Sequence, residues 1–430
     1  MSKLISCLLL FLFLSGTIII AVNSALASKI VEDSWNAKAP IPMALEYSDL
    51  HSGLDTVVVD GKIYAMGGSS FGVGGINRCY DPVIDKWSIL ETHPNQNARV
   101  SIFAFQDKIY CIDSIVPSRE MEVYDIATDS WSVRSAISGL VGYIWKVHVM
   151  DDKVFILTTP WLLLQSPYNA DEWYNRCVVR LFVYDPVNDY CIEKASIPFP
   201  QHYGESCASV VVDGKVMVFG SFFTGTSLAF DNDEQVYKGW VYDLNVDVWS
   251  EVKLSAPDGV SILVGATTGL YAPQKIYFFQ SVQKDDTAPY DGMYHGYGYP
   301  CTYVYDPLNN SWSTAQPMLT PYGVYNVAVI DDVIYVIGEG RTPINSGSTK
   351  KEYFNMQYVP RGYQDTLQST GNTLPLEGLL PQNWFSNSWI IIISIVLTAG
   401  VAATGLVWFR LQKKKNPQIN LSHNLVVNSE

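Results

Sequence analysis

Three segments of the sequence combine aromatic rings with carboxylates in a way that suits ligand binding: residues 158–176, 220–238 and 280–300. Their rings give the candidate binding residues Trp161, Tyr168, Trp173, Tyr174, Phe222, Phe223, Phe230, Tyr290, Tyr294, His295, Tyr297 and Tyr299. The accompanying carboxylates are Asp171, Glu172, Asp231, Asp233, Asp285, Asp286 and Asp291. Rigid rings supply contact area and oxygens supply direction, so we expect these segments to bind a protein or a carbohydrate. The alternative is that the rings pack against one another to order their own loops.

Metal and covalent chemistry have little support in the spacing of side chains. The histidines between the two apolar ends of the chain follow no ligand motif: His51, His93, His148, His202 and His295. The cysteines after Cys7 occur singly, and both disulfides and buried free thiols stay open for them: Cys79, Cys111, Cys177, Cys191, Cys207 and Cys301. No nucleophile elbow, phosphate loop or HExxH motif occurs. We therefore expect no metal, no cofactor and no catalytic residue.

A repeated pattern of short apolar runs must position these segments. Each unit begins with two runs about a turn: TVVVDGKIYAMGG from Thr56, SIFAFQDKIYCIDS from Ser101, VHVMDDKVFILTT from Val147, SVVVDGKVMVFGS from Ser209, GLYAPQKIYFFQS from Gly269 and VAVIDDVIYVIGE from Val327. Asp-Gly at 60–61 and 213–214 predicts type I′ turns, whose central residues need positive φ. The flanking β-branched runs predict inner strands that are covered on both faces.

The second half of each unit is a Tyr-Asp strand, a polar turn and an aromatic marker. The strands are CYDPVIDKW from Cys79, VYDIATDSW from Val123, VYDPVNDYC from Val183, VYDLNVDVW from Val241, VYDPLNNSW from Val304 and a degenerate QYVP from Gln357. The markers are Trp35, Trp87, Trp131, Tyr190, Trp249 and Trp312, at a spacing of roughly fifty residues. Each unit is predicted to be a four-stranded antiparallel blade.

This pattern resembles the Kelch repeat of β-propellers over residues 35 to about 360. The resemblance implies an all-β, six-bladed Kelch propeller. The last unit lacks a Trp strand, and DSWNAKAPIP at 33–42 is a Trp strand without a hairpin before it. We therefore expect the N-terminal strand to close the last blade, which also hides the sheet edges. Connections between the second and third strands should leave one face, and the three aromatic segments are such connections.

The two ends of the chain read as targeting and membrane segments. Residues 1–27 have the form of a signal peptide, with Ala25-Leu26-Ala27 at the cleavage site, although an uncleaved anchor is the alternative. Residues 389–408 carry no charge and are long enough for a transmembrane helix. The basic tail at 409–430 should be cytoplasmic. The propeller at 28–360 and a linker at 361–388 are then expected on the outside of the cell.

Charge limits the partners of this outer part. Residues 28–388 hold 23 basic and 41 acidic residues, a net charge of −18. Such a surface argues against nucleic acid and anionic lipid as partners. Asn309 begins the glycosylation sequon Asn309-Asn310-Ser311.

The function expected from these features is that of a cell-surface, membrane-tethered binding module for a protein or glycan ligand. The alternative is an extracellular carbohydrate-active enzyme. It would be similar to the sialic acid mutarotases, or less closely to copper-radical oxidases such as galactose oxidase. Both resemblances concern the fold alone, since no catalytic residue of either group maps onto this sequence by motif.

Overall fold

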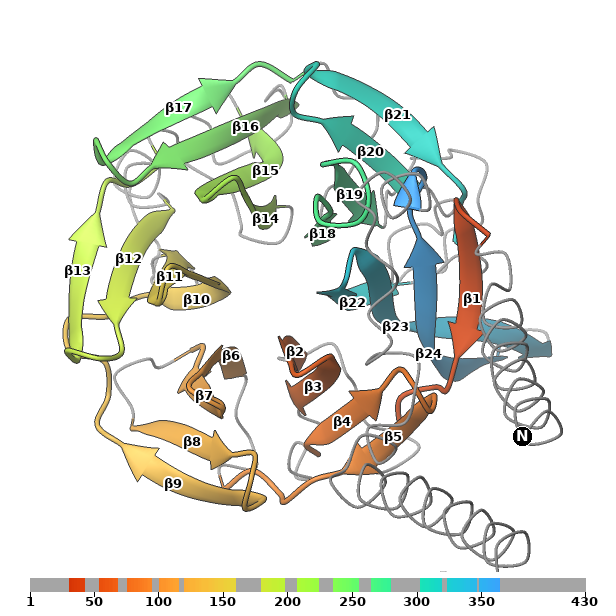
Figure 1. Cartoon of the computed structure of the whole chain (residues 1–430), viewed down its shortest axis with the longest axis horizontal. Helices are drawn as coiled ribbons and strands as arrows, with labels where there is room; N and C mark the ends of the chain where they lie inside the picture. The colour runs from red at the N-terminus through yellow and green to blue at the C-terminus, as the bar shows by residue number, and fades with distance from the viewer. Residues whose placement is uncertain are drawn as a thin grey trace, which may run out of the picture. The chain divides into compact units, whose positions relative to one another are not determined.

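The structure is a computed structural model. Within the residues that it describes, twenty-four β-strands form six four-stranded sheets around a common axis (Figure 1). The described ranges are 31–42, 54–68, 76–94, 100–115, 120–159, 179–197, 207–223, 235–254, 264–279, 302–318, 323–345 and 348–363. All of them belong to one unit of the chain, Met1–Asn372. The prediction of an all-β, six-bladed propeller is confirmed.

The predicted targeting and membrane segments lie outside the described residues. These are the signal peptide at 1–27, the linker after Tyr363, the transmembrane segment at 389–408 and the tail at 409–430. In the described ranges, no helix has both the length and the apolar composition that crossing a membrane requires.

The first three blades follow one another along the chain, each with strands in sequential order from the axis outward. Blade one consists of β2 (Leu54–Val59), β3 (Lys62–Gly67), β4 (Arg78–Asp81) and β5 (Lys86–Ile89). Blade two consists of β6 (Val100–Phe105), β7 (Lys108–Asp113), β8 (Met121–Asp125) and β9 (Ser130–Arg134). Blade three consists of β10 (Tyr143–Met150), β11 (Lys153–Thr159), β12 (Arg180–Asp185) and β13 (Tyr190–Lys194).

The last three blades keep this order except at the closure. Blade four consists of β14 (Cys207–Val212), β15 (Lys215–Phe223), β16 (Gln235–Asp243) and β17 (Val248–Val252). Blade five consists of β18 (Val264–Thr267), β19 (Ile276–Phe279), β20 (Thr302–Asp306) and β21 (Ser311–Ala315). Blade six consists of β22 (Gly323–Ile330), β23 (Val333–Asn345), β24 (Ser348–Val359) and, from the N-terminal end, β1 (Ser34–Lys38).

The N-terminal strand closes the ring as the sequence predicts. β1 runs antiparallel to β24, with Trp35 opposite Tyr358 in register. The Trp35 ring is buried and lies 4.9 Å from the Tyr358 ring and 5.7 Å from the Phe279 ring of blade five. Strands from the two ends of the described chain therefore share one sheet and one core.

The inner hairpins have the turn geometry that the sequence predicts. At Asp60-Gly61 and Asp213-Gly214 both central residues have positive φ, between 49° and 68°. Three further hairpins adopt the same left-handed geometry without glycine, at Gln106-Asp107, Asp151-Asp152 and Asp331-Asp332. Asp and Asn tolerate this region better than other residues with side chains, which explains why aspartate fills most of these positions.

The inner hairpin of blade five departs from the prediction. The sequence was expected to form two strands from Gly269 onward, but the first strand is β18, which ends at Thr267. The segment that follows forms a longer connection, because Pro273 has no N–H to donate to a strand partner. The Asp332 carboxylate of blade six fixes this connection, since its Oδ2 accepts the backbone N–H groups of Gly269, Leu270, Tyr271 and Ala272 at 2.6–3.0 Å.

The marker position of blade three also differs from the prediction. Register places Cys191 opposite Tyr184, as Trp87 is opposite Tyr80, whereas Tyr190 pairs with Asp185. A shift of one residue moves a side chain to the other face of a strand. Tyr190 is accordingly 47% exposed, while Cys191 packs against the core between blades two and three. Cys191, and not Tyr190, replaces the marker tryptophan.

In blades one, two and four, aspartate and tryptophan at the outer strand tie the blade to the segment that leaves the preceding blade. In blade one, Asp85 accepts the Tyr80 hydroxyl at 2.7 Å and the Ala39 N–H at 2.8 Å, and the Trp87 indole donates to the Ala39 carbonyl. Blades two and four repeat this set with Asp129 and Trp131, and with Asp247 and Trp249. The set is therefore a structural feature of the repeat.

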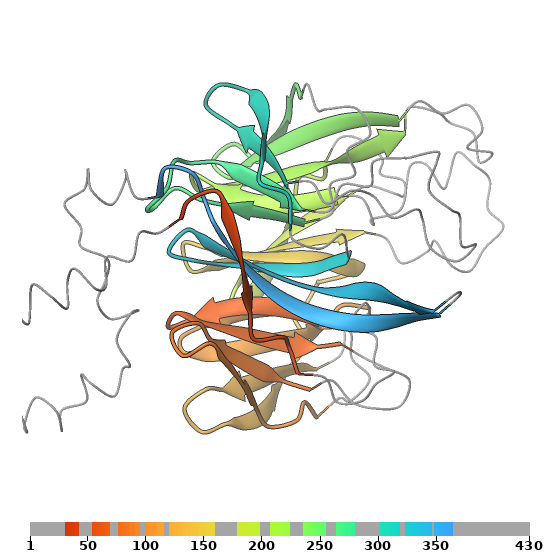
Figure 2. The same cartoon turned by 90° about the vertical axis from the view of Figure 1, so that its right-hand side faces the viewer.

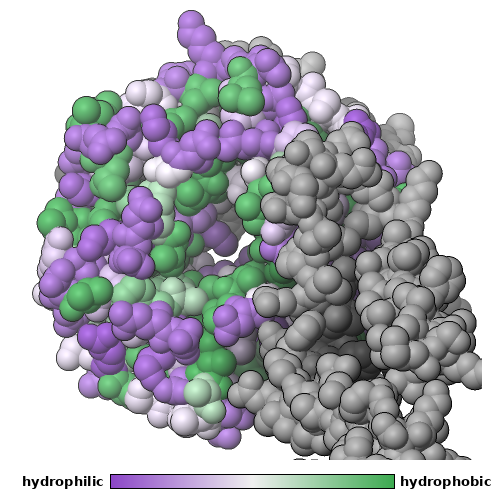
Figure 3. Space-filling view, in the orientation of Figure 1, coloured by the Kyte–Doolittle hydropathy of each residue, from purple (hydrophilic) through white to green (hydrophobic). Residues whose placement is uncertain are grey.

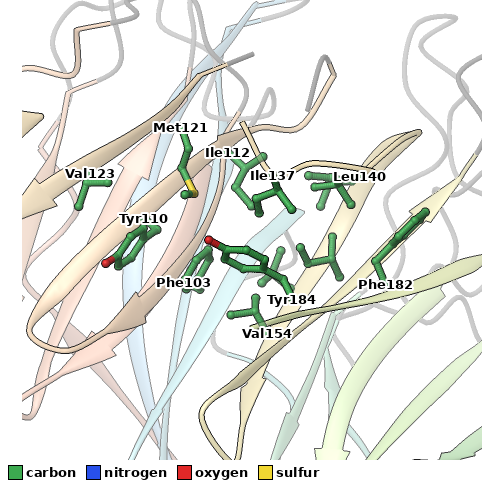
Figure 4. Close-up of a cluster of buried hydrophobic side chains, with 13 residues drawn as sticks. Phe103, Tyr110, Ile112, Met121, Val123, Ile137, Leu140, Val154, Phe182 and Tyr184 are labelled. Carbon is green, nitrogen blue, oxygen red and sulfur yellow. The ribbon is translucent and has the colours of Figure 1, made fainter. Parts of the chain in front are cut away.

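The hydrophobic core is divided among the interfaces between blades. The cluster between blades two and three shows the arrangement: Phe103 and Tyr110 of blade two stack at 4.9 Å, and Tyr184 and Val154 of blade three face them (Figure 4). Five further clusters fill the other interfaces in the described part of the chain. Each blade is thus buried on both faces, which accounts for the nearly continuous apolar runs in the sequence.

Candidate recognition face

The alternating direction of the strands gives the propeller two different faces. The inner hairpin turns, such as 60–61 and 213–214, lie on one face, which we call the turn face. The connections from the second to the third strand of each blade leave from the other, which we call the loop face. Figure 3 views the turn face, where hydrophilic and hydrophobic residues alternate around an opening near the centre.

Most of the predicted binding residues lie outside the described residues. They are Trp161, Tyr168, Trp173, Tyr174, Phe230, Tyr290, Tyr294, His295, Tyr297 and Tyr299. Phe222 and Phe223 form the end of β15, opposite Val236 and Gln235 of β16, at the edge of the loop face. The strands that flank the three segments confirm that all three connect second to third strands, so they leave from one face.

Blade six has a feature that was not predicted from the sequence. β23 and β24 pair from Ile334 opposite Tyr358 as far as Asn345 opposite Ser348. Their neighbours are shorter. The pairing of β22 with β23 ends at Glu339, and the pairing of β1 with β24 ends at Asn355. Residues 340–345 and 348–354, which we call the arm, therefore extend from the loop face as a two-stranded ribbon (Figure 2). The long run without a Tyr-Asp motif before QYVP was the signal for it.

A polar group joins four blades near the axis. The Asp55 carboxylate of β2 accepts the N–H of Ile102 in blade two at 3.0 Å and the side-chain amide of Asn326 in blade six at 2.9 Å. It also accepts the N–H of Thr56, and Lys146 of blade three places its ammonium 3.8 Å away. Asp55 interrupts a run of β-branched residues, and that interruption was the sequence signal. The two charged groups that meet here, Asp55 and Lys146, pair with each other.

His148 is a second polar residue on an inner strand. Its Nε2 lies 2.7 Å from the hydroxyl oxygen of Ser209 in blade four. Burial, together with the charge of Lys146, lowers the pKa of His148 to about 3. The imidazole is therefore neutral at physiological pH and joins blades three and four by a neutral hydrogen bond.

Cysteines and histidines are the side chains on which a metal site would depend. Cys79, Cys111 and Cys191 carry free thiols, of which Cys79 and Cys111 are buried. Burial raises the pKa of the Cys191 thiol to about 11. Among the described residues, no three His, Cys, Asp or Glu side chains gather as a metal site would require. Cys177, Cys301, His51, His202 and His295 lie outside the described residues.

Asn309 lies away from the loop face. It is exposed in the turn between β20 and β21, and its side-chain amide donates to Asp306 at 2.8 Å. The antiparallel order of the strands places that turn on the turn face. Its glycosylation stays a prediction.

Comparison with known proteins agrees with the repeat and the ring of blades. The chain is 23% identical over 200 residues to Kelch-like protein 35 of Mus musculus, which covers 44% of this chain and 30% of the mouse protein. It is 25% identical over 199 residues to an F-box/kelch-repeat protein of Arabidopsis thaliana, with 42% of each chain covered. The chain is a Kelch-repeat propeller.

Other comparisons add less about this Kelch propeller. A Kelch-like protein of Aspergillus terreus is 33% identical over 70 residues, 15% of this chain and 14% of the relative. No family model matches the chain. The matches span less than half the length of each of these relatives. The relationship to Kelch-repeat proteins supports a protein-interaction module.

Proposed function

We propose that this Kelch propeller is a membrane-tethered interaction module on the cell surface, and that its loop face binds a protein ligand. The observation that carries the proposal is the position of the chain ends. Arg361 donates to Asp33, and the N–H of Gly362 donates to Glu32, so both ends of the described chain meet at the turn face. The loop face lies on the opposite side of the propeller.

This arrangement suits a tether. The predicted transmembrane segment at 389–408 follows the described chain after a linker rich in Gly, Pro, Ser, Thr and Asn. A propeller held from its turn face presents its loop face to the surroundings. The three aromatic insertions join strands at that face, and the arm extends from it, which supports its role in recognition. A glycan ligand stays a second prediction, drawn from the aromatic rings alone.

The topology is tested by proteolysis of intact cells that express the full chain with an epitope at each end of the propeller. We expect added protease to remove residues 28–388 and to leave the tail after residue 408 protected. The protease-treated lysate serves as the control for cleavability. Protection of the propeller on intact cells, with cleavage in the lysate, would contradict the proposed location.

The role of the loop face is tested by replacing Trp173 and Tyr297 with alanine in the full chain. We expect binding to printed arrays of cell-surface proteins and neutral glycans to fall by about tenfold or more, since such rings act as anchors. The melting temperature should change little if the rings face a ligand. A large fall in melting temperature would instead show that they form the core of their own loops.

A further inference from the structure

Exposed aliphatic side chains recur at the same place in five of the six blades. The turns between third and fourth strands occupy residues 82–85, 126–129, 186–189, 244–247 and 307–310. Each turn ends at an aspartate or asparagine with positive φ, and in four of them an aliphatic side chain lies one or two positions earlier: Ile84, Val187, Val246 and Leu308. In blade six, Val31 precedes Asp33 by two positions. These five side chains, which we call the apolar tips, are 57–77% exposed.

The apolar tips lie on the turn face. The third strand of a blade runs toward this face and the fourth runs away from it, because neighbouring strands are antiparallel. Figure 3, which views this face, shows hydrophobic residues between hydrophilic ones around the rim. A single exposed aliphatic residue is ordinary on a protein surface. Here the repeat places one in almost every blade on the same side of the propeller.

The polar groups of the same turns already have partners within the protein. The aspartate before a turn pairs with a lysine of the second strand, as Asp243 does with Lys215 at 3.3 Å. The left-handed residue at the end of the turn accepts a buried tyrosine hydroxyl, as Asp247 does from Tyr242 at 2.7 Å. Polar groups that are hydrogen-bonded cost less to remove from bulk water than free ones. The turns can therefore approach an apolar phase with these groups still paired.

The described chain ends on this face. The Tyr363 ring lies 6.3 Å from the Tyr271 ring in the inner connection of blade five, where Leu270 is a further exposed aliphatic residue. Residues 364–388 separate this end from the predicted transmembrane segment, and a flexible chain of that length spans about 25–30 Å on average. A tether of this kind makes contact with the bilayer an intramolecular event, so weak interactions suffice.

We propose that the turn face rests on the outer surface of the bilayer, with the apolar tips inserted among the lipid headgroups. This inference rests on the proposed function, because it requires a propeller that is tethered outside the cell. Interfacial binding grows with the apolar area that is inserted. Residues 28–388 carry a net charge of −18, which anionic lipid would repel, so the expected surface is zwitterionic. Such contact would hold the loop face away from the membrane.

The test uses the full chain in phosphatidylcholine nanodiscs that contain a phospholipid with a photoactivatable group near its headgroup. After illumination, mass spectrometry of the digested chain locates the lipid adducts. We expect the turns that carry apolar tips to be labelled about fivefold more than the outer strands, because only the turns reach the headgroups. Replacing part of the phosphatidylcholine with phosphatidylserine should lower this labelling, since the acidic propeller is repelled.

A loss variant and a matched control locate the contact. The loss variant replaces three apolar tips: Val187→Ser, Val246→Ser and Leu308→Ser. It should lower the labelling of the turns about fivefold, because the inserted apolar area is removed. The control replaces three exposed aliphatic side chains of the outer strands: Ile89→Ser, Val133→Ser and Ile192→Ser. It removes similar side chains at other positions and should leave the labelling unchanged.

A gain variant keeps the test valid if the loss variant fails to fold. The turn of blade two has exposed Ala127 and Thr128 at the positions where other blades have an apolar tip. Ala127→Leu supplies the missing tip and should produce new lipid adducts at 126–129. Adducts at this turn that stay at the wild-type level in a folded Ala127→Leu chain would contradict the inference.

The remaining outcomes separate this inference from the proposed function. Turns labelled no more than the outer strands, or labelled more strongly on the anionic bilayer, overturn it. Dimers in native mass spectrometry that the loss variant abolishes, with unlabelled turns, would show that a second copy occupies this face and would also overturn it. Proteolysis of intact cells reports the location of the propeller independently, so an external propeller with unlabelled turns would contradict this inference alone. Labelling that decreases in the loss variant and increases in the gain variant would establish the turn face as a bilayer contact.

Discussion

Replacing Asp33 with alanine is expected to lower the free energy of unfolding by about 2–4 kcal/mol, because it removes the clasp that closes the ring. Asp33 Oδ1 accepts the Tyr358 hydroxyl at 2.7 Å and the Gln316 N–H at 2.8 Å, while Oδ2 accepts the Arg361 guanidinium. These contacts join the two ends of the described chain to blade five. Chemical unfolding of the full chain, followed by tryptophan fluorescence, measures the loss.

Asp129 provides a matched control for this prediction. In blade two it accepts the Tyr124 hydroxyl and the Glu91 N–H. These two contacts correspond to those of Asp33 with the Tyr358 hydroxyl and the Gln316 N–H. In that blade the third and outer strands are joined by a continuous turn, whereas β24 and β1 are held together without a covalent link. Asp129→Ala should therefore cost less than Asp33→Ala. Equal losses would contradict the idea that closure depends on the Asp33 clasp.

The clasp should also weaken in acid. Burial raises the pKa of the Asp33 carboxyl, but the hydrogen bonds from Gln316, Tyr358 and Arg361 outweigh it and hold the pKa below its ordinary value. A carboxyl with a lowered pKa in the folded state stabilises the protein above its unfolded pKa of about 3.9 and loses that effect as the pH falls through the folded pKa. The difference in stability between the wild type and Asp33→Ala should accordingly shrink below about pH 4.

The repeat made the architecture predictable, because each blade carries its own local signals. Asp-Gly turns and β-branched runs specify hairpins within a few residues. The closure by DSWNAKAPIP followed from counting strands, since a blade without its outer strand needs one from elsewhere. In these cases the local turn and strand signals and the order of the strands predicted the same fold.

The predictions were wrong where the strand register or a residue distant in sequence determined the local structure. Cys191 and Tyr190 are adjacent, and an aromatic residue looked like the better substitute for tryptophan, although the pairing with Tyr184 selects Cys191. The connection after Thr267 depends on Asp332, which is more than sixty residues away in blade six. No local pattern encodes that contact.

The axial group was missed for a similar reason. Asp55, Lys146 and Asn326 come from three different blades, and each looks in sequence like a single polar residue on an apolar strand. Their convergence follows from the ring, because inner strands of all blades approach the axis (Figure 1). The lysine at or directly before the start of the second strand in blades one to five was visible in sequence, yet its pairing partner, as in Lys153 with Asp185 at 2.6 Å, required the structure.

Replacing Asp55 with alanine is the second change with a large expected effect, a loss of about 3 kcal/mol in the free energy of unfolding. The substitution leaves the Ile102 N–H without its acceptor and removes one of the two acceptors of the Asn326 amide, whose other contact is the Leu54 carbonyl at 3.3 Å. It also unpairs Lys146. Blades one, two, three and six would all lose a contact near the axis.

Asp55→Asn separates the role of the carboxylate from simple loss of volume. Both carboxylate oxygens accept N–H groups, Oδ1 from Asn326 and Oδ2 from Ile102. The amide of asparagine would have to direct its NH2 group at one of these donors, so this nearly isosteric change should also destabilise the protein. Unfolding at the wild-type denaturant concentration would show that the donors do not depend on a carboxylate.

Two further variants test whether charge or hydrogen bonding dominates at this position. Lys146→Met removes a partner that lies 3.8 Å away and is partly exposed, so it should cost less than about 1 kcal/mol. Asp81→Ala removes a carboxylate of the same blade that pairs with the exposed Lys62, and it should also cost little. If Lys146→Met were instead as damaging as Asp55→Ala, the ion pair and not the three N–H donors would hold the inner strands together.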